Sequence, residues 1–342
     1  MNETDSRVIN SLRFPLAVMV VAIHSYIAID GWVYNSVASQ GIGSNVAQFF
    51  MIAISHVLTH VAVPTFFLIS GYLFFNNFDN GNTIVWRKKM LSRVKTLLIP
   101  YVIWVALYIL YSMIMSYKSI VGDGIWEWYN SHGGLSMFWC SETWNLDRKD
   151  IWGQPDIASS PILVPFWFLR NLIVCVVLSP LFYSLFKKSN SNITTVIALS
   201  VLSFLYFTQT SLRVPGLSVS SMFYFGIGAA LSLWNRSLVE TFSMNKKVVW
   251  PIFVILTVIE ISLYGHNTMW GNIIYPFFVF VGVWSIIALK PQNGGGRITH
   301  SLFTLFIYSL FHSLNWRYQN YCALLRAKQR LITFALRTST HY

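Results

Sequence analysis

Long apolar runs, separated by short polar stretches, constrain this chain more than any other feature of its sequence. A helix needs roughly 20 mostly apolar residues to cross a bilayer. Nine runs approach or exceed that length: 8–29, 48–75, 97–117, 162–186, 194–207, 217–234, 248–264, 269–289 and 301–316. Charged residues make up only 11% of the 342 residues, against about 25% in soluble domains, so lipid must cover much of the surface. The sequence therefore predicts an all-α fold, a polytopic transmembrane helix bundle of about nine to ten spans.

The distribution of charge predicts how this bundle is oriented. The formal net charge is +12, and in so apolar a chain this excess indicates loops that face the cytoplasmic leaflet rather than nucleic acid. With the N-terminus inside, most Lys and Arg residues before the last run fall in inside segments, whereas six acidic residues gather in the outside loop 118–161. We expect a multi-pass protein of the bacterial inner (plasma) membrane with a cytoplasmic N-terminus.

The end of the chain does not follow this alternation. Nine spans would leave the basic residues after Trp316 outside, and no run long enough to span follows them. We therefore divide the chain into a transmembrane domain, 1–316, and a basic C-terminal tail, 317–342. A missing last span, a wrongly assigned span, or a truncated or frame-altered copy would each explain the tail.

The first run carries two ionisable residues, Arg13 and His24, which are 11 positions apart. At about 100° per residue both point to one helix face, and at about 1.5 Å per residue they lie roughly 16 Å apart along the axis. Ionisable groups within a span are costly and usually face a cavity or a partner. The two residues either form a polar stripe that runs across the membrane, or act separately at the two ends of the span, with Arg13 at the inner headgroups and His24 at the outer ones.

Other polar residues lie within the predicted spans. Arg170 is about eight residues into the fourth run, where it lines a cavity or reaches the outer interface. Glu260 is the acid well inside a span, and it orients a base, pairs with Arg170 or reaches the outer headgroups. Ser70 and Tyr72 hydrogen-bond either to substrate or to a neighbouring helix.

Known metal and cofactor motifs are missing. His56 and His60 have the i, i+4 spacing that can hold a metal, but no third ligand is evident. The three cysteines have neither CxxC nor zinc spacing, and GxGxxG, Walker A, HExxH and GxSxG motifs are lacking. We predict no metal site and no tightly bound cofactor.

The loop 118–161 is long for a polytopic protein and rich in tryptophan. Its tryptophans lie among carboxylates. Aromatic rings stack on the C–H faces of sugars while carboxylates accept bonds from sugar hydroxyls, so the loop suits a glycan. Alternatively, the tryptophans anchor the chain at the membrane interface.

Several segments resemble, in order, the motifs of the type-3 membrane acyltransferase family, whose members O-acetylate bacterial surface polysaccharides and related glycans. The first is the Arg-x10-His pattern formed by Arg13 and His24. The others are 64–73 (PTFFLISGYL), 87–93 (RKKMLSR), 98–101 (LIPY), 166–172 (FWFLRNL) and 307–312 (IYSLFH). The chain departs from the family at Asn171, where many relatives have Asp, and in the tail, where a tenth helix is expected.

The resemblance implies acyl transfer from the thioester of acetyl-CoA to a hydroxyl of a cell-surface glycan or its lipid-linked precursor. His24 would act as general base or carry the acyl group covalently, and Arg13 would pair with phosphates of the donor or orient donor or acceptor. Acetyl-CoA, the glycan and membrane lipid are the expected partners, with no nucleic acid. The expected substrate-binding residues are Arg93, Arg170, Asn171, Ser70, Tyr72, His312 and Glu260.

Two other functions remain open from the sequence. An acyl or glycan transporter or flippase would use Arg13 and His24 in a relay, and it predicts broken helices in two matching halves. A membrane partner protein without catalysis would agree with Asn171 and the unusual tail. Within the family, a succinyl group in place of acetyl would need room for a second carboxylate.

Overall fold

The structure is a computed structural model of the 342-residue chain, and it describes residues 1–26, 52–78, 83–149, 155–187, 192–212, 214–243, 246–263 and 269–288. These residues belong to one compact unit, Met1–Lys290. The predicted run 301–316, with His312, and the predicted tail lie outside the described residues, so the division at residue 316 stays a prediction.

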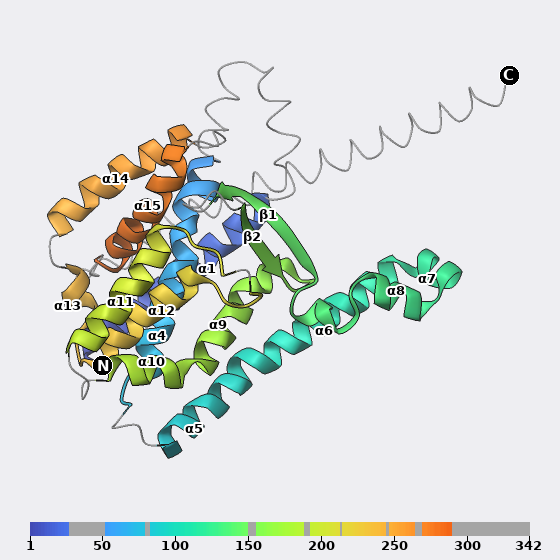
Figure 1. The fold of residues 1–342 in the computed structure, drawn as a ribbon, viewed down its shortest axis with the longest axis horizontal. Coiled ribbons are helices and arrows are strands. Elements are labelled where there is room, and N and C mark those ends of the chain that lie inside the picture. Colours follow the sequence, from blue (N-terminus) through green and yellow to red (C-terminus); the bar gives the residue numbers. More distant parts are fainter. Residues whose placement is uncertain are drawn as a thin grey trace. The chain divides into compact units, whose positions relative to one another are not determined.

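The described chain is mostly helical (Figure 1). Its first part comprises α1 (Glu3–Tyr26), the π-helical η2 (Ile52–Val57), the 3-10 helix η3 (Leu58–Val61), α4 (Ala62–Phe75), α5 (Thr83–Arg93), the π-helical η4 (Val94–Leu98), α6 (Ile99–Met115), α7 (Tyr117–Asp123), α8 (Ile125–Ser131) and the 3-10 helix η5 (Gly134–Phe138). After the strands β1 (Glu142–Lys149) and β2 (Pro155–Ser160) come the 3-10 helix η6 (Val164–Phe166), α9 (Trp167–Val177), α10 (Ser179–Phe186), α11 (Asn192–Phe207), α12 (Val219–Leu233), α13 (Leu238–Ser243), α14 (Lys246–Leu263) and α15 (Met269–Ile287).

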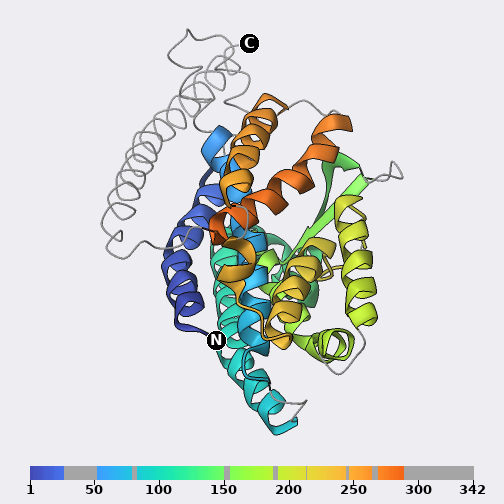
Figure 2. The ribbon, with the colours of Figure 1, turned by 90° about the vertical axis from the view of Figure 1, so that its left-hand side faces the viewer.

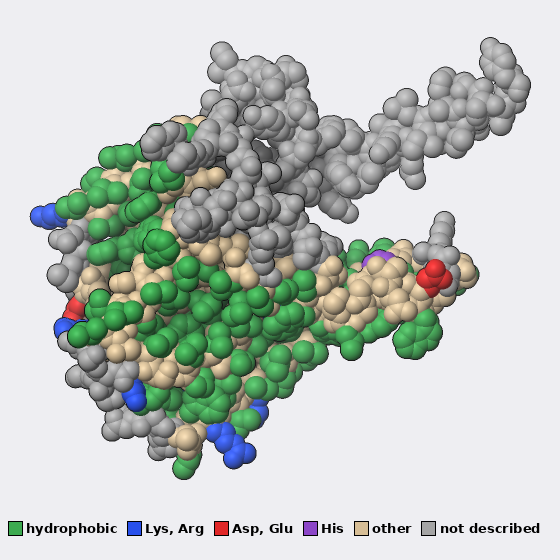
Figure 3. Space-filling view, viewed as in Figure 1, with side chains coloured by type: hydrophobic (Ala, Val, Ile, Leu, Met, Phe, Trp, Pro, Cys, Tyr) green, Lys and Arg blue, Asp and Glu red, His purple; other side chains and the backbone are tan. Residues whose placement is uncertain are grey.

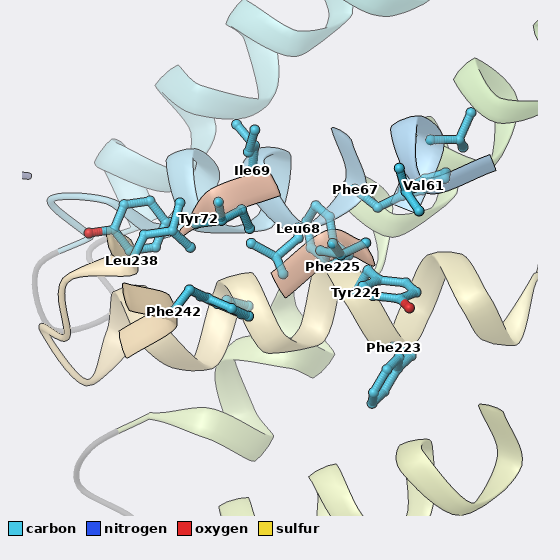
Figure 4. Close-up of a cluster of buried hydrophobic side chains, with 14 of the residues drawn as sticks. Val61, Phe67, Leu68, Ile69, Tyr72, Phe223, Tyr224, Phe225, Leu238 and Phe242 are labelled. Atoms are coloured by element: carbon cyan, nitrogen blue, oxygen red, sulfur yellow. The ribbon is translucent and has the colours of Figure 1, made fainter. Parts of the chain in front are cut away.

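The contact between α4 and α12 lies at the centre of the bundle. A Cβ atom added to Gly71 would lie 2.2 Å from the Phe225 carbonyl oxygen, and one added to Gly228 would lie 2.0 Å from the Leu68 carbonyl oxygen. Glycine lets the two backbones approach this closely, as small residues do in membrane helix pairs. The side chains of Leu68, Phe225 and the fully buried Tyr224 fill the space beside the contact (Figure 4).

Three described helices are long and apolar enough to cross a membrane: Glu3–Ile23, Leu58–Phe75 and Thr83–Met115. The bent pair Val164–Val177 and Ser179–Phe186 would make a fourth, and shorter apolar helices include Ile193–Phe207 and Val219–Leu233. Apolar side chains cover much of the described face seen in Figure 3, as lipid contact requires. The chain is therefore a helical membrane protein, and the span number of nine to ten stays a prediction.

The third predicted run begins much earlier than the sequence indicated. The basic residues 87–93 fell between the predicted runs 48–75 and 97–117, but α5, η4 and α6 form one helical stretch, Thr83–Met115, at the edge of the bundle (Figures 1 and 2). Lys and Arg are good helix formers, so charge alone does not end a helix. Pro100 lacks a backbone N–H, and the wider π-helical turn η4 directly before it accommodates that loss.

The fourth predicted run, 162–186, is not one straight helix. Its helices α9 and α10 are bent by 55° at a short break. Pro180 causes the break, because its ring cannot continue the hydrogen-bond pattern of α9 and instead occupies the first turn of α10.

The all-α prediction is confirmed for the bundle, and the structure adds one small sheet in the long loop. Strands β1 and β2 pair antiparallel, with Glu142 opposite Ser160 and Asn145 opposite Ile157, and the register shifts between Asn145 and Lys149. Two further bonds extend this pairing at its base, from Ser141 N to Ser160 O and from Ile162 N to Met137 O. We call residues 137–149 and 155–162 the hairpin.

Candidate functional site

Arg13 on α1 and Arg93 at the end of α5 are two cationic residues that we call the cationic pair. The two guanidinium groups are close enough to repel each other electrostatically. The Arg13 side chain is exposed and that of Arg93 is half-buried. Within the part of the chain that the structure describes, neither forms an ion pair with a carboxylate. Two adjacent guanidinium groups without a carboxylate attract an anion, and phosphate matches their planar donors.

His24 lies on the same helix as Arg13, since α1 runs unbroken from Glu3 to Tyr26. The expected separation of about 16 Å follows from this continuity. The His24 side chain lies outside the described residues, and so its role stays a prediction.

Arg170 on α9 is only 2% exposed and is held by neutral oxygen atoms. Its Nη1 donates to the Trp139 carbonyl at 2.5 Å and its Nη2 to the Ser159 carbonyl at 2.9 Å. The Asn171 Oδ1 atom accepts from Nε at 3.3 Å and from Nη2 at 3.1 Å. The guanidinium also lies over the Trp139 ring, 5.8 Å from its centroid. The side chains of Arg170 and Asn171 thus meet each other, and they contact the hairpin.

Tyr72 is buried on α4, and its hydroxyl is engaged within the protein. It donates to the Asp5 carboxylate at 2.7 Å and lies 3.3 Å from the Arg236 carbonyl. Asp5 is fully buried and also accepts from Ser237 Oγ at 2.9 Å and from Val239 N at 2.9 Å. This group joins the start of α1 to α4 and to the first turn of α13, which makes it a structural contact.

The remaining predicted residues are spread through the bundle. Ser70 is half-buried on α4, and Glu260 is half-buried on α14. His60 on η3 lies beside Tyr275 on α15, with 3.3 Å between Nδ1 and the hydroxyl oxygen. Among the described residues, no three His, Cys, Asp or Glu side chains gather in a way that could hold a metal. The structure brings together Arg13 with Arg93 and Arg170 with Asn171, but not these two groups with Ser70 or Glu260 in one cluster.

Sequence reasoning missed three residues that organise these groups. Asp5 precedes the first apolar run and was not singled out, because its partners on α4 and α13 are distant in the sequence. Tyr101, eight residues after Arg93, donates its hydroxyl proton to the Phe138 carbonyl and so ties α6 to the hairpin. Trp139 was one of several loop tryptophans, and nothing local distinguishes it.

The fold and these groups define a helical membrane protein with a cationic pair, Arg13 on α1 and Arg93 on α5. The chain belongs to the type-3 acyltransferase family: the family model described as "Acyltransferase domain" matches residues 7–312. The resemblance to this family is therefore confirmed. The match includes Arg13, Arg93 and Arg170 and ends at His312.

The chain is also similar to the succinoglycan biosynthesis protein ExoH of Rhizobium meliloti (strain 1021), with 25% identity over 190 residues. This similarity covers 53% of the chain and 43% of that relative, so the chain spans less than half of its length. No solved structure matches the chain.

Proposed function

We propose that this protein is an O-acyltransferase that moves an acetyl group from acetyl-CoA to a hydroxyl of a cell-surface glycan or its lipid-linked precursor. Membership of the acyltransferase family supports the reaction class, and a relative named for succinoglycan biosynthesis supports a glycan acceptor. The observation that carries the proposal is the electrostatic repulsion between Arg13 and Arg93, which have no carboxylate partner among the described residues, because the phosphates of coenzyme A are anions that suit two such guanidinium groups.

The proposed reaction uses two ends of α1. Arg13, with Arg93, holds the phosphates of the donor near the cytoplasmic surface, and His24 lies about 16 Å further along the helix. His24 takes the proton of the acceptor hydroxyl while the oxygen of that hydroxyl attacks the thioester carbonyl. The new C–O bond forms, the C–S bond breaks, and the proton passes to the coenzyme A thiolate. A covalent acyl group on His24 would divide the same transfer into two steps.

The proposal places the protein in the bacterial inner membrane with a cytoplasmic N-terminus. In this orientation the basic residues of α5 face the cytoplasm, as the distribution of Lys and Arg favours. The hairpin is then on the opposite side, where a surface glycan or its lipid-linked precursor would be available. Transfer of succinate in place of acetate is a second form of the same reaction.

The experiment is acyl transfer by the full chain in membrane vesicles, with radiolabelled acetyl-CoA and glycan extracted from producing cells. We expect His24→Ala to abolish labelling of the glycan and Arg13→Gln to raise the KM for acetyl-CoA. Arg7→Gln is the matched control, because Arg7 lies on the same helix with an exposed side chain paired to Glu3. Equal labelling by wild type and His24→Ala would refute the assignment of His24, and an unlabelled glycan with wild type would refute the reaction.

A transporter or flippase is the second candidate, and the bend between α9 and α10 supplies one of the two broken helices that it requires. Transporter sites are often formed by discontinuous helices in two corresponding halves. Within the described residues, one such bent pair occurs. Movement of acyl or glycan groups across vesicles, without transfer of label, would support this candidate over the transferase.

A further inference from the structure

Arg170 binds the two sides of the hairpin at its base. Its Nη1 donates to the carbonyl of Trp139, which precedes β1, and its Nη2 donates to the carbonyl of Ser159 near the end of β2. These residues are 20 positions apart in the sequence. One rigid guanidinium therefore sets the distance and direction between the two sides.

The hydrogen-bond partners of Arg170 among the described atoms are neutral. Within the described residues its partners are carbonyl and hydroxyl oxygens and the Asn171 amide, with no carboxylate among them. A buried charge is costly unless several hydrogen bonds compensate for it. Since two backbone carbonyls of the hairpin supply part of that compensation, moving the hairpin away would leave the guanidinium with only the Asn171 amide oxygen among these partners.

Trp139 connects the same point to a second loop. Its indole N–H donates to the Pro215 carbonyl at 3.1 Å. A Cβ added to Gly216, whose φ is +93°, would lie 2.9 Å from the Trp139 ring. The ring is therefore held between Arg170 and the loop before α12, while 40% of the residue stays exposed.

Tyr101 holds the hairpin from the side of α6, where its hydroxyl donates to the Phe138 carbonyl. Tyr101 follows Arg93 by eight positions in one continuous helical stretch, which corresponds to about 12 Å along the axis. The cationic pair and the base of the hairpin are thus spaced along the same helical stretch.

We infer that the hairpin binds the sugar acceptor. Arg170 is a positioning residue that holds the hairpin in place for this binding. Strand β1 contains Glu142, Trp144, Asn145 and Asp147, and the partly exposed Trp139 precedes it. By sequence alone, β1 thus carries an indole, two acids and an amide, the residue types that stack on sugar rings and accept hydroxyl protons. This inference rests on the proposed function for the identity of the acceptor, but the fixing of the hairpin by Arg170 is independent of it.

The experiment compares Arg170→Gln and Arg170→Lys with wild type in two measurements on the full chain in nanodiscs. The first is limited trypsin digestion at Arg148 and Lys149, at the end of β1, with the cut sites identified by mass spectrometry. The second is the KM for extracted glycan and for acetyl-CoA. Arg236→Gln is the matched control, because its side chain is exposed.

We expect both Arg170 variants to be cut at least fivefold faster at these two sites. Lysine is expected to fail because a single ammonium group cannot hold two carbonyls in the fork geometry of a guanidinium. The KM for glycan should rise about tenfold, while the KM for acetyl-CoA stays within twofold. Trp139→Phe keeps an aromatic ring but loses the indole N–H. This milder variant should raise the cleavage rate and the glycan KM by smaller factors.

Three results would overturn the inference. Unchanged digestion with a raised glycan KM would mean that Arg170 touches the acceptor itself. Unchanged digestion with a raised acetyl-CoA KM would assign Arg170 to the donor. Faster digestion with unchanged glycan KM would remove the hairpin from acceptor binding. If wild type transfers no acetyl group at all, the proposed function fails, and the digestion still decides whether Arg170 fixes the hairpin.

Discussion

The Tyr72 hydroxyl donates a 2.7 Å hydrogen bond to the fully buried Asp5 carboxylate, and this bond joins α4 to the start of α1. Because α1 also carries Arg13, this hydrogen bond helps to fix the position of Arg13 along the axis of α4. The same carboxylate accepts from Ser237 Oγ and from two backbone N–H groups of α13, so three helices depend on one negative charge.

Replacing Asp5 with Asn should destabilise the protein strongly. The amide keeps one acceptor oxygen but directs its NH₂ group at donors that already need an acceptor. Hydrogen bonds to charged groups contribute about 1.5–3 kcal/mol each, so we expect a loss of at least about that size in the free energy of unfolding in detergent. Tyr72→Phe should lose less, and the double variant should lose less than the sum. Glu3→Gln, at an exposed ion pair, serves as the control and should change little.

A methyl group at either central glycine should prevent the correct packing of α4 against α12. The Cβ of Gly228→Ala would meet the Leu68 carbonyl oxygen at 2.0 Å and the Tyr72 nitrogen at 2.7 Å. Both are backbone atoms, so only a shift of a whole helix relieves the clash. We expect Gly71→Ala and Gly228→Ala to lose the monodisperse peak in fluorescence-detected size-exclusion chromatography. Gly122→Ala is the control, since nothing lies within 4 Å of its added Cβ, and a normal peak for Gly228→Ala would contradict the close contact.

The sequence predicted the helices well where an apolar run is long and is bounded by turn residues. It misplaced the start of α5, because Arg87, Lys88 and Lys89 were interpreted as a loop although these residues favour helices. The bend before α10 has a local signal in Pro180. The hairpin has a weaker local sequence signal, because its strands are short and polar and their pairing depends on contacts at the base.

The candidate site was predictable only in part, for a physical reason. Arg13 and Arg93 were singled out individually, but their proximity depends on how α1 and α5 pack, which periodicity does not encode. The Asp5 partners lie 67 and 234 positions away in the sequence, so no local pattern identifies them. The cost of Arg170 inside a span predicted that it lines a cavity or reaches the interface, and the structure shows that hairpin carbonyls offset part of this cost; its predicted role in substrate binding came from the resemblance to the family and stays a prediction.

Asn171→Asp should stabilise the region around Arg170. The Asn171 Oδ1 atom already lies 3.1 Å from Nη2 and 3.3 Å from Nε, so a carboxylate there would give the buried guanidinium a counter-charge without a change of shape. Charge-assisted bonds are stronger than neutral ones. We expect a higher melting temperature in detergent and slower trypsin cleavage at Arg148 and Lys149. Asn171→Leu, which removes the acceptor, should do the opposite, and equal melting temperatures for all three proteins would contradict the role of Asn171.

Lys89 and Lys88 are adjacent but should respond differently to the same substitution. The Lys89 ammonium donates to the carbonyls of Phe74 and Asn76 at 2.8 and 2.5 Å, and so caps the C-terminal end of α4. The Lys88 side chain is exposed. We expect Lys89→Gln to lower the melting temperature and Lys88→Gln to leave it unchanged, with the KM for acetyl-CoA within twofold for both. A raised KM for Lys89→Gln at unchanged stability would instead place Lys89 in donor binding.

The cationic pair should recognise the phosphates of the donor rather than its acyl group. Acetyl-CoA and S-acetylpantetheine present the same thioester, but only the first carries phosphates. Wild type should therefore prefer acetyl-CoA in kcat/KM by at least about 100-fold, which corresponds to about 2.7 kcal/mol, and this preference should fall as salt screens the charges. Arg13→Gln and Arg93→Gln should each reduce the preference, and the double variant should nearly abolish it while transfer from S-acetylpantetheine persists. If the double variant kept the wild-type preference, the phosphates would have to bind elsewhere, and the two guanidinium groups would serve only the packing of α1 against α5.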